Sequence, residues 1–142
     1  MVLGMTALPG AAVLVRTWFG DGDAWESLLL EVRTPSEDGF LANVVAVDDP
    51  ALEGLTAEAL QAKQKAGPFV SFLADETTLV RAEHPILAVW VFARRDGSQL
   101  DHRPFRVVPS ALWSVENNIN SANMDWREFA GSVGDDGVFR GF

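Results

Sequence analysis

The run Ile86–Ala93, ILAVWVFA, constrains the fold of this chain more than any other segment. It is the most continuously hydrophobic stretch of the sequence and contains no charged residue. A strand with this composition has no polar face, so it has to be covered on both sides. We therefore expect a central strand here, in a sheet that carries helices on both of its faces.

Strand and helix patterns alternate along the rest of the chain. Further strands are predicted at 11–19, 40–47, 69–74 and 105–108. Helices are predicted from Asp23 to Pro35 and at 56–65, 110–122 and 125–133, with a turn or short helix at 75–83. This order predicts a single α/β domain over residues 1–142, with a mixed, mostly parallel sheet of about five strands flanked by helices, and a C-terminal helical pair. The strands 86–93 and 105–108 should form an antiparallel hairpin.

Polar residues mark the expected starts of several helices. Asp23 and Glu26 have capping-box spacing, and so do Asp125 and Glu128. Ser110 is placed to cap the helix that follows it.

The composition limits the classes of partner. Hydrophobic residues make up 48% of the chain and charged residues 22%, which is typical of a globular protein. The net charge of −9 would repel nucleic acid and anionic membranes, so a protein or a small neutral or cationic ligand is the expected partner. A homodimer is a further option. The lack of cysteines excludes disulfides, thiolate metal sites and cysteine nucleophiles. The apolar N-terminus lacks the basic residues of a signal peptide, so we expect a cytoplasmic protein.

Four asparagines crowd the C-terminal third of the sequence, at positions 117, 118, 120 and 123. In a helix over 110–122, Leu112, Val115, Ile119 and Ala122 would form the buried stripe. Trp113, Asn117 and Asn120 would share a neighbouring face. An indole beside two amides suits a polar ligand or a partner's backbone, so these three residues are the predicted binding site. The alternative, which we favour, is that the amides hydrogen-bond within the fold.

Acidic residues follow the first three predicted strands. Asp21, Asp48 and Asp75 would lie at the carboxyl ends of these strands, where open α/β sheets bind ligands. Carboxylates are the ligands that Mg²⁺ prefers, so these residues are a weak candidate for a magnesium site. Helix caps and turns explain the same residues without a metal, and no other cofactor is expected.

Other catalytic patterns are not supported by the sequence. His84 and His102 have no serine or cysteine at a recognisable motif spacing, so the sequence does not support a hydrolytic triad. The Gly20-Asp21-Gly22 turn is too short for a phosphate-binding loop.

Several motifs resemble those of a family of small, mainly actinobacterial proteins known as a domain of unknown function. They are Leu14-Val15-Arg16-Thr17, 34–40 (TPSEDGF), 47–50 (VDDP), 106–110 (RVVPS), 115–118 (VENN), 122–125 (ANMD) and the terminal 137–142 (GVFRGF). The resemblance covers nearly the whole chain. It implies a stand-alone bacterial domain and supplies no activity, cofactor or catalytic residue.

Three functional hypotheses follow. The first is a non-catalytic acidic binding or regulatory protein that uses Trp113, Asn117 and Asn120. The second is a magnesium-dependent phosphoryl-transfer or hydrolase enzyme at Asp21, Asp48 and Asp75. The third is an immunity-like inhibitor of a basic toxin, because an acidic surface speeds association with a cationic enzyme.

Overall fold

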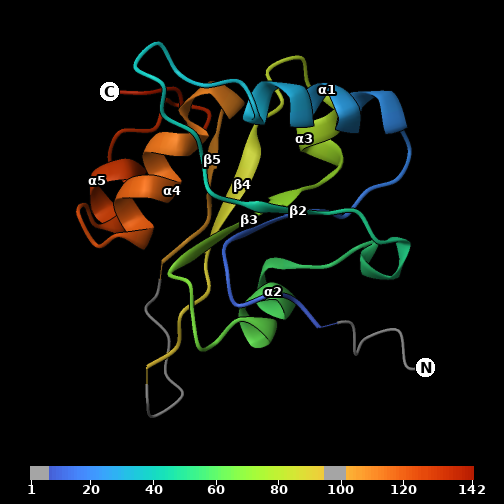
Figure 1. Ribbon diagram of the computed structural model, residues 1–142, viewed down its shortest axis with the longest axis horizontal. Helices are drawn as coiled ribbons and strands as arrows, with labels where there is room; N and C mark the ends of the chain where they lie inside the picture. Colours follow the sequence, from blue (N-terminus) through green and yellow to red (C-terminus); the bar gives the residue numbers. More distant parts are fainter. Residues whose placement is uncertain (1–6, 95–101) are drawn as a thin grey trace.

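The computed structural model describes residues 7–94 and 102–142 (Figure 1). Six strands within these residues form one sheet in the order β2-β1-β3-β4-β5-β6. The strands are β1 (Val13–Arg16), β2 (Val45–Val47), β3 (Val70–Ala74), β4 (Ile86–Trp90), β5 (Phe105–Val107) and β6 (Val138–Phe139). The predicted central strand is confirmed, because β4 lies between β3 and β5.

The sheet is mixed and mostly parallel, as predicted. Strand β1 pairs in parallel with β2 and with β3, and β5 pairs in parallel with β6. Only β4 runs the other way, antiparallel to β3 and β5. The predicted hairpin is thus present, with Ile86 opposite Val107.

Helices cover both faces of the sheet. They are α1 (Gly22–Val32), α2 (Ala57–Lys63), α3 (Glu76–Val80), α4 (Leu112–Asn120) and α5 (Trp126–Ala130), with 3-10 turns η2 (Pro50–Leu52) and η3 (Pro109–Ala111). Because side chains alternate along β1, Leu14 packs with the helices α1, α3, α4 and α5, whereas Val13 and Val15 pack with Leu60 of α2. Figure 1 shows α1 and α2 on opposite sides of the sheet. In the described residues, none of the helices has the length and apolar character needed to cross a bilayer.

Strand β2 is shorter than the predicted strand 40–47. The backbone before Val45 is drawn to α4 and not to β1: the Leu41 carbonyl accepts a hydrogen bond from Asn117, and the Asn43 N–H donates to Glu116. Over this part of the segment, hydrogen bonds to side chains of α4 therefore take the place of backbone hydrogen bonds to β1. Strand β6 was not predicted, because its two residues are too few to show a period.

Two of the predicted helix caps are wrong. Asp21, and not Asp23, is the N-cap of α1 and accepts a hydrogen bond from the Ala24 N–H, so Asp23 lies in the first turn. Ser110 lies inside η3, and α4 starts after Ala111 without a side-chain cap. The capping box of Asp125 and Glu128 is confirmed at the start of α5.

The predicted buried stripe of α4 is confirmed for Leu112, Val115 and Ile119. Ala122 is not part of it. The helix ends at Asn120, and Ala122 is exposed with a φ angle of 60°, in the left-handed region. The last residue of the expected stripe belongs to the turn between α4 and α5.

Candidate functional site

A buried carboxylate organises the polar side of α4. Glu116 is only 5% exposed. Its Oε1 accepts hydrogen bonds from the Asn43 N–H at 2.6 Å and from Asn117 Nδ2 at 3.0 Å. Its Oε2 accepts one from Asn120 Nδ2 at 3.0 Å. Three donors therefore compensate for the removal of this charge from water.

The two asparagines of the predicted site make further bonds within the fold. Asn120 Oδ1 accepts from the N–H groups of Phe69 and Val70 at 3.0 and 2.9 Å, and its Nδ2 donates to the Val70 carbonyl at 3.2 Å. Asn117 Nδ2 donates to the Leu41 carbonyl at 2.9 Å. Asn120 thus holds the start of β3, and Asn117 holds the segment before β2.

The third residue of that site, Trp113, is half-buried and stacks on Phe40, with ring centroids 4.8 Å apart and planes 12° from parallel. All three side chains therefore fasten α4 to neighbouring segments. These contacts favour the architectural interpretation of the asparagine cluster, and ligand binding by Trp113, Asn117 and Asn120 stays a prediction.

The three residues of the expected magnesium site each make contacts of their own within the fold. Asp21 caps α1, and Asp48 forms an ion pair with Arg16 at 3.4 Å. Asp75 caps α3 in a capping box with Thr78. Among the described residues, no group of three or more His, Asp or Glu side chains could hold a metal ion. A magnesium requirement stays a prediction.

Asp75 also faces Arg106 of β5 in a two-point ion pair. Arg106 Nη1 and Nη2 donate to the two carboxylate oxygens at 3.0 and 2.8 Å. Partial burial would raise the pKa of Asp75, but the hydrogen bonds from Arg106 and from the Thr78 N–H outweigh it, so the pKa lies below its ordinary value. The pair joins α3 to the far side of the β4–β5 hairpin.

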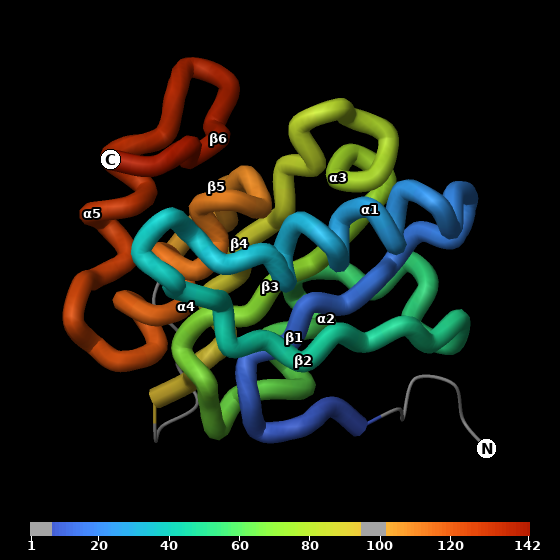
Figure 2. Tube along the Cα trace, turned by 45° about the horizontal axis from the view of Figure 1, so that its top comes forward, coloured from blue at the N-terminus to red at the C-terminus, as the bar shows by residue number. Residues whose placement is uncertain are grey.

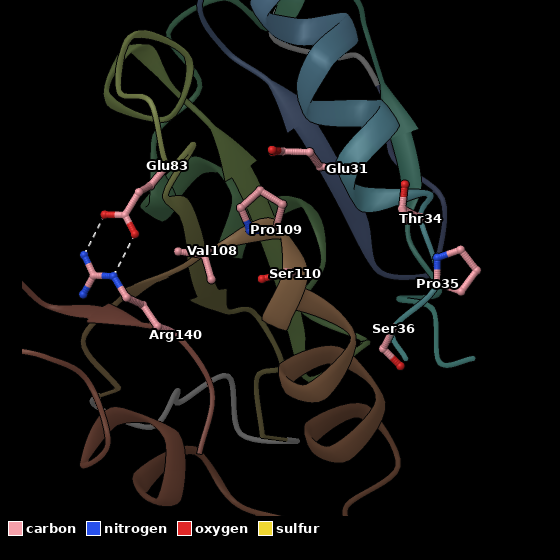
Figure 3. Close-up of a pocket in the computed structure, with 9 residues that line it drawn as sticks. All are labelled: Glu31, Thr34, Pro35, Ser36, Glu83, Val108, Pro109, Ser110 and Arg140. Atoms are coloured by element: carbon pink, nitrogen blue, oxygen red, sulfur yellow. Dashed lines mark hydrogen bonds and ion pairs between the residues drawn. The ribbon is translucent and has the colours of Figure 1, made fainter. Parts of the chain in front are cut away.

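A pocket of about 500 Å³ lies between the end of α1, η3 and the C-terminal segment, and Figure 3 shows the residues that line it. Glu83 and Arg140 face each other on one side, and Thr34, Pro35 and Ser36 lie on the other. Val108, Pro109 and Ser110 lie between them. The pocket therefore brings together 34–36, 108–110 and Arg140, from three of the motifs on which the family resemblance rests.

Most polar groups of this pocket are already engaged. Arg140 donates to Glu83 at 2.8 Å and to Asp136 at 2.7 Å. These hydrogen bonds lower the pKa of both carboxyls and raise the pKa of the guanidinium. Thr34 Oγ1 donates to the Leu30 carbonyl, and Ser36 Oγ accepts from the Phe40 N–H. The contacts of Arg140 anchor the C-terminal segment, and those of Thr34 and Ser36 are local, which leaves few groups of the pocket for a ligand.

A second pocket, of about 390 Å³, lies beside the C-terminal end of α4 and has aromatic walls. Trp90 of β4 stacks on Phe69, with centroids 5.4 Å apart and planes 17° from parallel. His102 and Trp126 form another nearly parallel pair, at 5.5 Å and 10°. The two pairs meet almost at right angles, since Trp90 lies at 88° to Trp126 and at 82° to His102.

Carboxylates complete the aromatic pocket. Asp125 and Glu128, at the start of α5, line it and are exposed. Each uses one oxygen in the capping box, where Asp125 Oδ1 accepts from the Glu128 N–H and Glu128 Oε2 accepts from the Asp125 N–H. The other oxygen of each has no hydrogen bond within the described residues. Aromatic walls with exposed carboxylate oxygens are suited to a cation.

The residues of this pocket do not stand out in the sequence. Phe69 directly precedes β3, Trp90 ends β4 and Trp126 begins α5, whereas His102 lies three residues before β5, so no local spacing connects them. Each was assigned to a strand, a loop or a helix on its own. The pairing of β3 with β4, which sets Val70 opposite Trp90, is what brings Phe69 beside Trp90.

The family named Domain of unknown function (DUF6924) matches residues 11–142. The chain belongs to this family. No curated protein matches the chain. The family therefore agrees with the expected uncharacterised domain, and a functional assignment has to come from the chemistry of the pockets.

Proposed function

We propose that this DUF6924 domain is a non-catalytic binding protein that takes an organic cation, an alkylammonium or guanidinium group, in the aromatic pocket. The observation that carries the proposal is the right-angled arrangement of Phe69–Trp90 and His102–Trp126 beside two carboxylates. The cation belongs to a small ligand or to a basic side chain of a partner.

The aromatic walls supply the attraction. The face of an indole ring carries negative electrostatic potential, and a cation within about 6 Å of the ring gains about 0.5–2 kcal/mol, depending on how fully it is desolvated. Phe69, Trp90 and His102 are half-buried, so part of each residue is open to solvent, whereas Trp126 is only 3% exposed and packs against Trp90 and His102.

The carboxylates supply the selectivity for charge. Asp125 and Glu128 line the pocket and are exposed, and the chain carries a net charge of −9. An anion would be repelled there, and a neutral ligand would gain nothing from either carboxylate. Because both carboxylates are fixed by the capping box of α5, their positions are set before a ligand arrives. The magnesium-dependent enzyme and the immunity-like inhibitor stay predictions from the sequence.

The proposal is tested with choline and with its neutral analogue, in which carbon replaces the quaternary nitrogen. The two have nearly the same shape, so a difference in affinity reports the charge. We expect choline to quench the tryptophan fluorescence saturably and to bind about tenfold more tightly than the analogue, which corresponds to roughly 1.4 kcal/mol.

Two variants locate the effect. Asp125→Asn with Glu128→Gln keeps the capping oxygens but removes both charges, and should weaken choline binding while leaving the analogue unchanged. Asp23→Asn, which removes a charge from the exposed first turn of α1, is the matched control and should bind as the wild type does. Equal affinity for the two probes, or choline binding that survives Trp90→Leu, would overturn the proposal.

A further inference from the structure

Strand β2 forms one edge of the sheet and has an open side (Figure 2). It pairs with β1 and with no other described strand. The Val45 N–H donates to the Ala12 carbonyl at 2.9 Å, so Val45 points its backbone groups toward β1. Because backbone groups alternate along a strand, the N–H and C=O of Ala46 point away from the sheet. An edge with free backbone groups is a template for a further strand.

Three apolar side chains of β2 and of the segment before it are exposed. Phe40 is 48% exposed, Leu41 41% and Val45 45%. The stretch 39–47 contains no charged residue. Natural edge strands are commonly protected by charged side chains or proline, and this stretch has neither. The shortness of β2, three residues, is therefore the main protection of this edge, and no charged side chain or proline adds to it.

The charges on either side of this stretch decide what can bind. Glu37 and Asp38 precede it, and Asp48 and Asp49 follow it. A second copy would bring the carboxylates of its own Glu37, Asp38, Asp48 and Asp49 to the same edge, where like charges repel. Two chains of charge −9 also repel each other. A second copy is therefore a poor occupant.

We propose that the β2 edge binds an extended segment of a partner protein, apolar in its centre and flanked by lysine or arginine, which adds to the sheet as a strand beside β2. Backbone hydrogen bonds to Ala46 fix the register of the added strand. Phe40, Leu41 and Val45 contact the apolar centre of the partner segment. The acidic residues at both ends of 39–47 pair with the basic flanks. This surface is separate from the aromatic pocket, so the two proposals stand or fall independently.

Amide hydrogen exchange followed by NMR tests the proposal at the level of one atom. The probe is a peptide of alternating valine and threonine with a pair of lysines at each end. In the free protein the Ala46 amide should exchange rapidly and the Val45 amide slowly, because only Val45 donates to β1. Saturating peptide should slow exchange at Ala46 by about tenfold or more and change Val45 little.

Variants separate strand addition from a loss of folding. Ala46→Pro removes the outward N–H at an edge position that tolerates proline, and should abolish binding, whereas Ala46→Ser keeps the N–H and should bind normally. Val45→Lys should also block the peptide, with Val45→Thr as its control, and this pair serves if Ala46→Pro does not fold.

Three results would overturn the proposal. One is equal binding of the same peptide with glutamates in place of lysines. Another is no protection of the Ala46 amide at millimolar peptide. The third is a dimer of the free protein that Val45→Lys dissociates, because it would identify a second copy as the occupant. Trp90→Leu should leave peptide binding unchanged.

Discussion

Glu116 and Asn120 lie one turn apart on α4, and the buried carboxylate of Glu116 accepts a hydrogen bond from the Asn120 amide at 3.0 Å. The same amide holds the backbone of Phe69 and Val70 through three more bonds. A single asparagine therefore connects α4 to the start of β3. Phe69 and the β3–β4 pair form one wall of the aromatic pocket, so this connection also positions the candidate site.

Asn120→Ala should lower the free energy of unfolding by about 3 kcal/mol. The substitution removes the hydrogen-bond partner of two backbone N–H groups, of a carbonyl and of one oxygen of a buried carboxylate. Asn117→Ala should cost less, about 1 kcal/mol, since Asn117 makes only two bonds and is partly exposed. Urea unfolding followed by tryptophan fluorescence measures both. If Asn120→Ala were neutral for stability but abolished ligand binding, the amide would be a recognition group and the architectural interpretation would be wrong.

The Asp75–Arg106 pair should make the fold sensitive to acid. The pKa of Asp75 is lowered in the folded protein, so the unfolded chain binds the proton more tightly. The stabilisation is then fully present above the ordinary pKa of aspartate, about 3.9, and is lost as the pH falls through the lower folded value. Urea unfolding between neutral pH and about pH 2 measures the loss.

Arg106→Gln isolates the part of this sensitivity that comes from Asp75. Near neutral pH the variant should be less stable by about 1–2 kcal/mol, because it loses a two-point, partly exposed ion pair. Below about pH 4 its stability should fall less steeply than that of the wild type. Parallel curves for the two proteins would show that Asp75 does not carry the acid response.

The C-terminal segment should be held by Phe139 more than by its ion pairs. Phe139 is fully buried and packs edge-to-face on Phe129, with centroids 5.2 Å apart, so Phe139→Ala should cost about 3–5 kcal/mol. Arg140 pairs with Glu83 and Asp136 in an exposed position, where salt screens the attraction. The effect of Arg140→Ala should therefore be small and should vanish in about 0.5 M NaCl.

Thermal unfolding at low and high salt compares the two variants. A salt-independent loss in Arg140→Ala as large as that in Phe139→Ala would contradict this ranking.

The sequence predicts the elements of this fold better than their contacts. Apolar runs identify the strands around β1, β3, β4 and β5, because this pattern is local. Helical spacing identifies helices in the same way. The length of β2 is not predictable in the same way, since it depends on Glu116 and Asn117, which lie more than 70 residues away in the sequence. Strand β6 is not predictable for a different reason, because two residues are too few to show an alternation of apolar and polar side chains.

The candidate site is still less accessible from the sequence. The polar motifs that attract attention, such as 115–118 and 34–36, make contacts that assemble the fold. The aromatic pocket depends on Phe69, Trp90, His102 and Trp126, which only the pairing of strands brings together. Conspicuous local residues therefore indicated architecture, whereas ordinary aromatic residues at the ends of elements form the pocket.

Ala122 lies in the turn between α4 and α5 and lines the aromatic pocket. Its backbone conformation offers a further test. Its φ of 60° places an alanine in the left-handed region, which costs a residue with a Cβ about 1–2 kcal/mol. Ala122→Gly relieves this strain but adds freedom to the unfolded chain, so it should raise the free energy of unfolding by up to about 1 kcal/mol. Ala122→Val should lower it, because a β-branched side chain tolerates this conformation least. Urea unfolding of both variants decides the matter: a loss of stability in Ala122→Gly would mean that the turn is not held in the left-handed conformation.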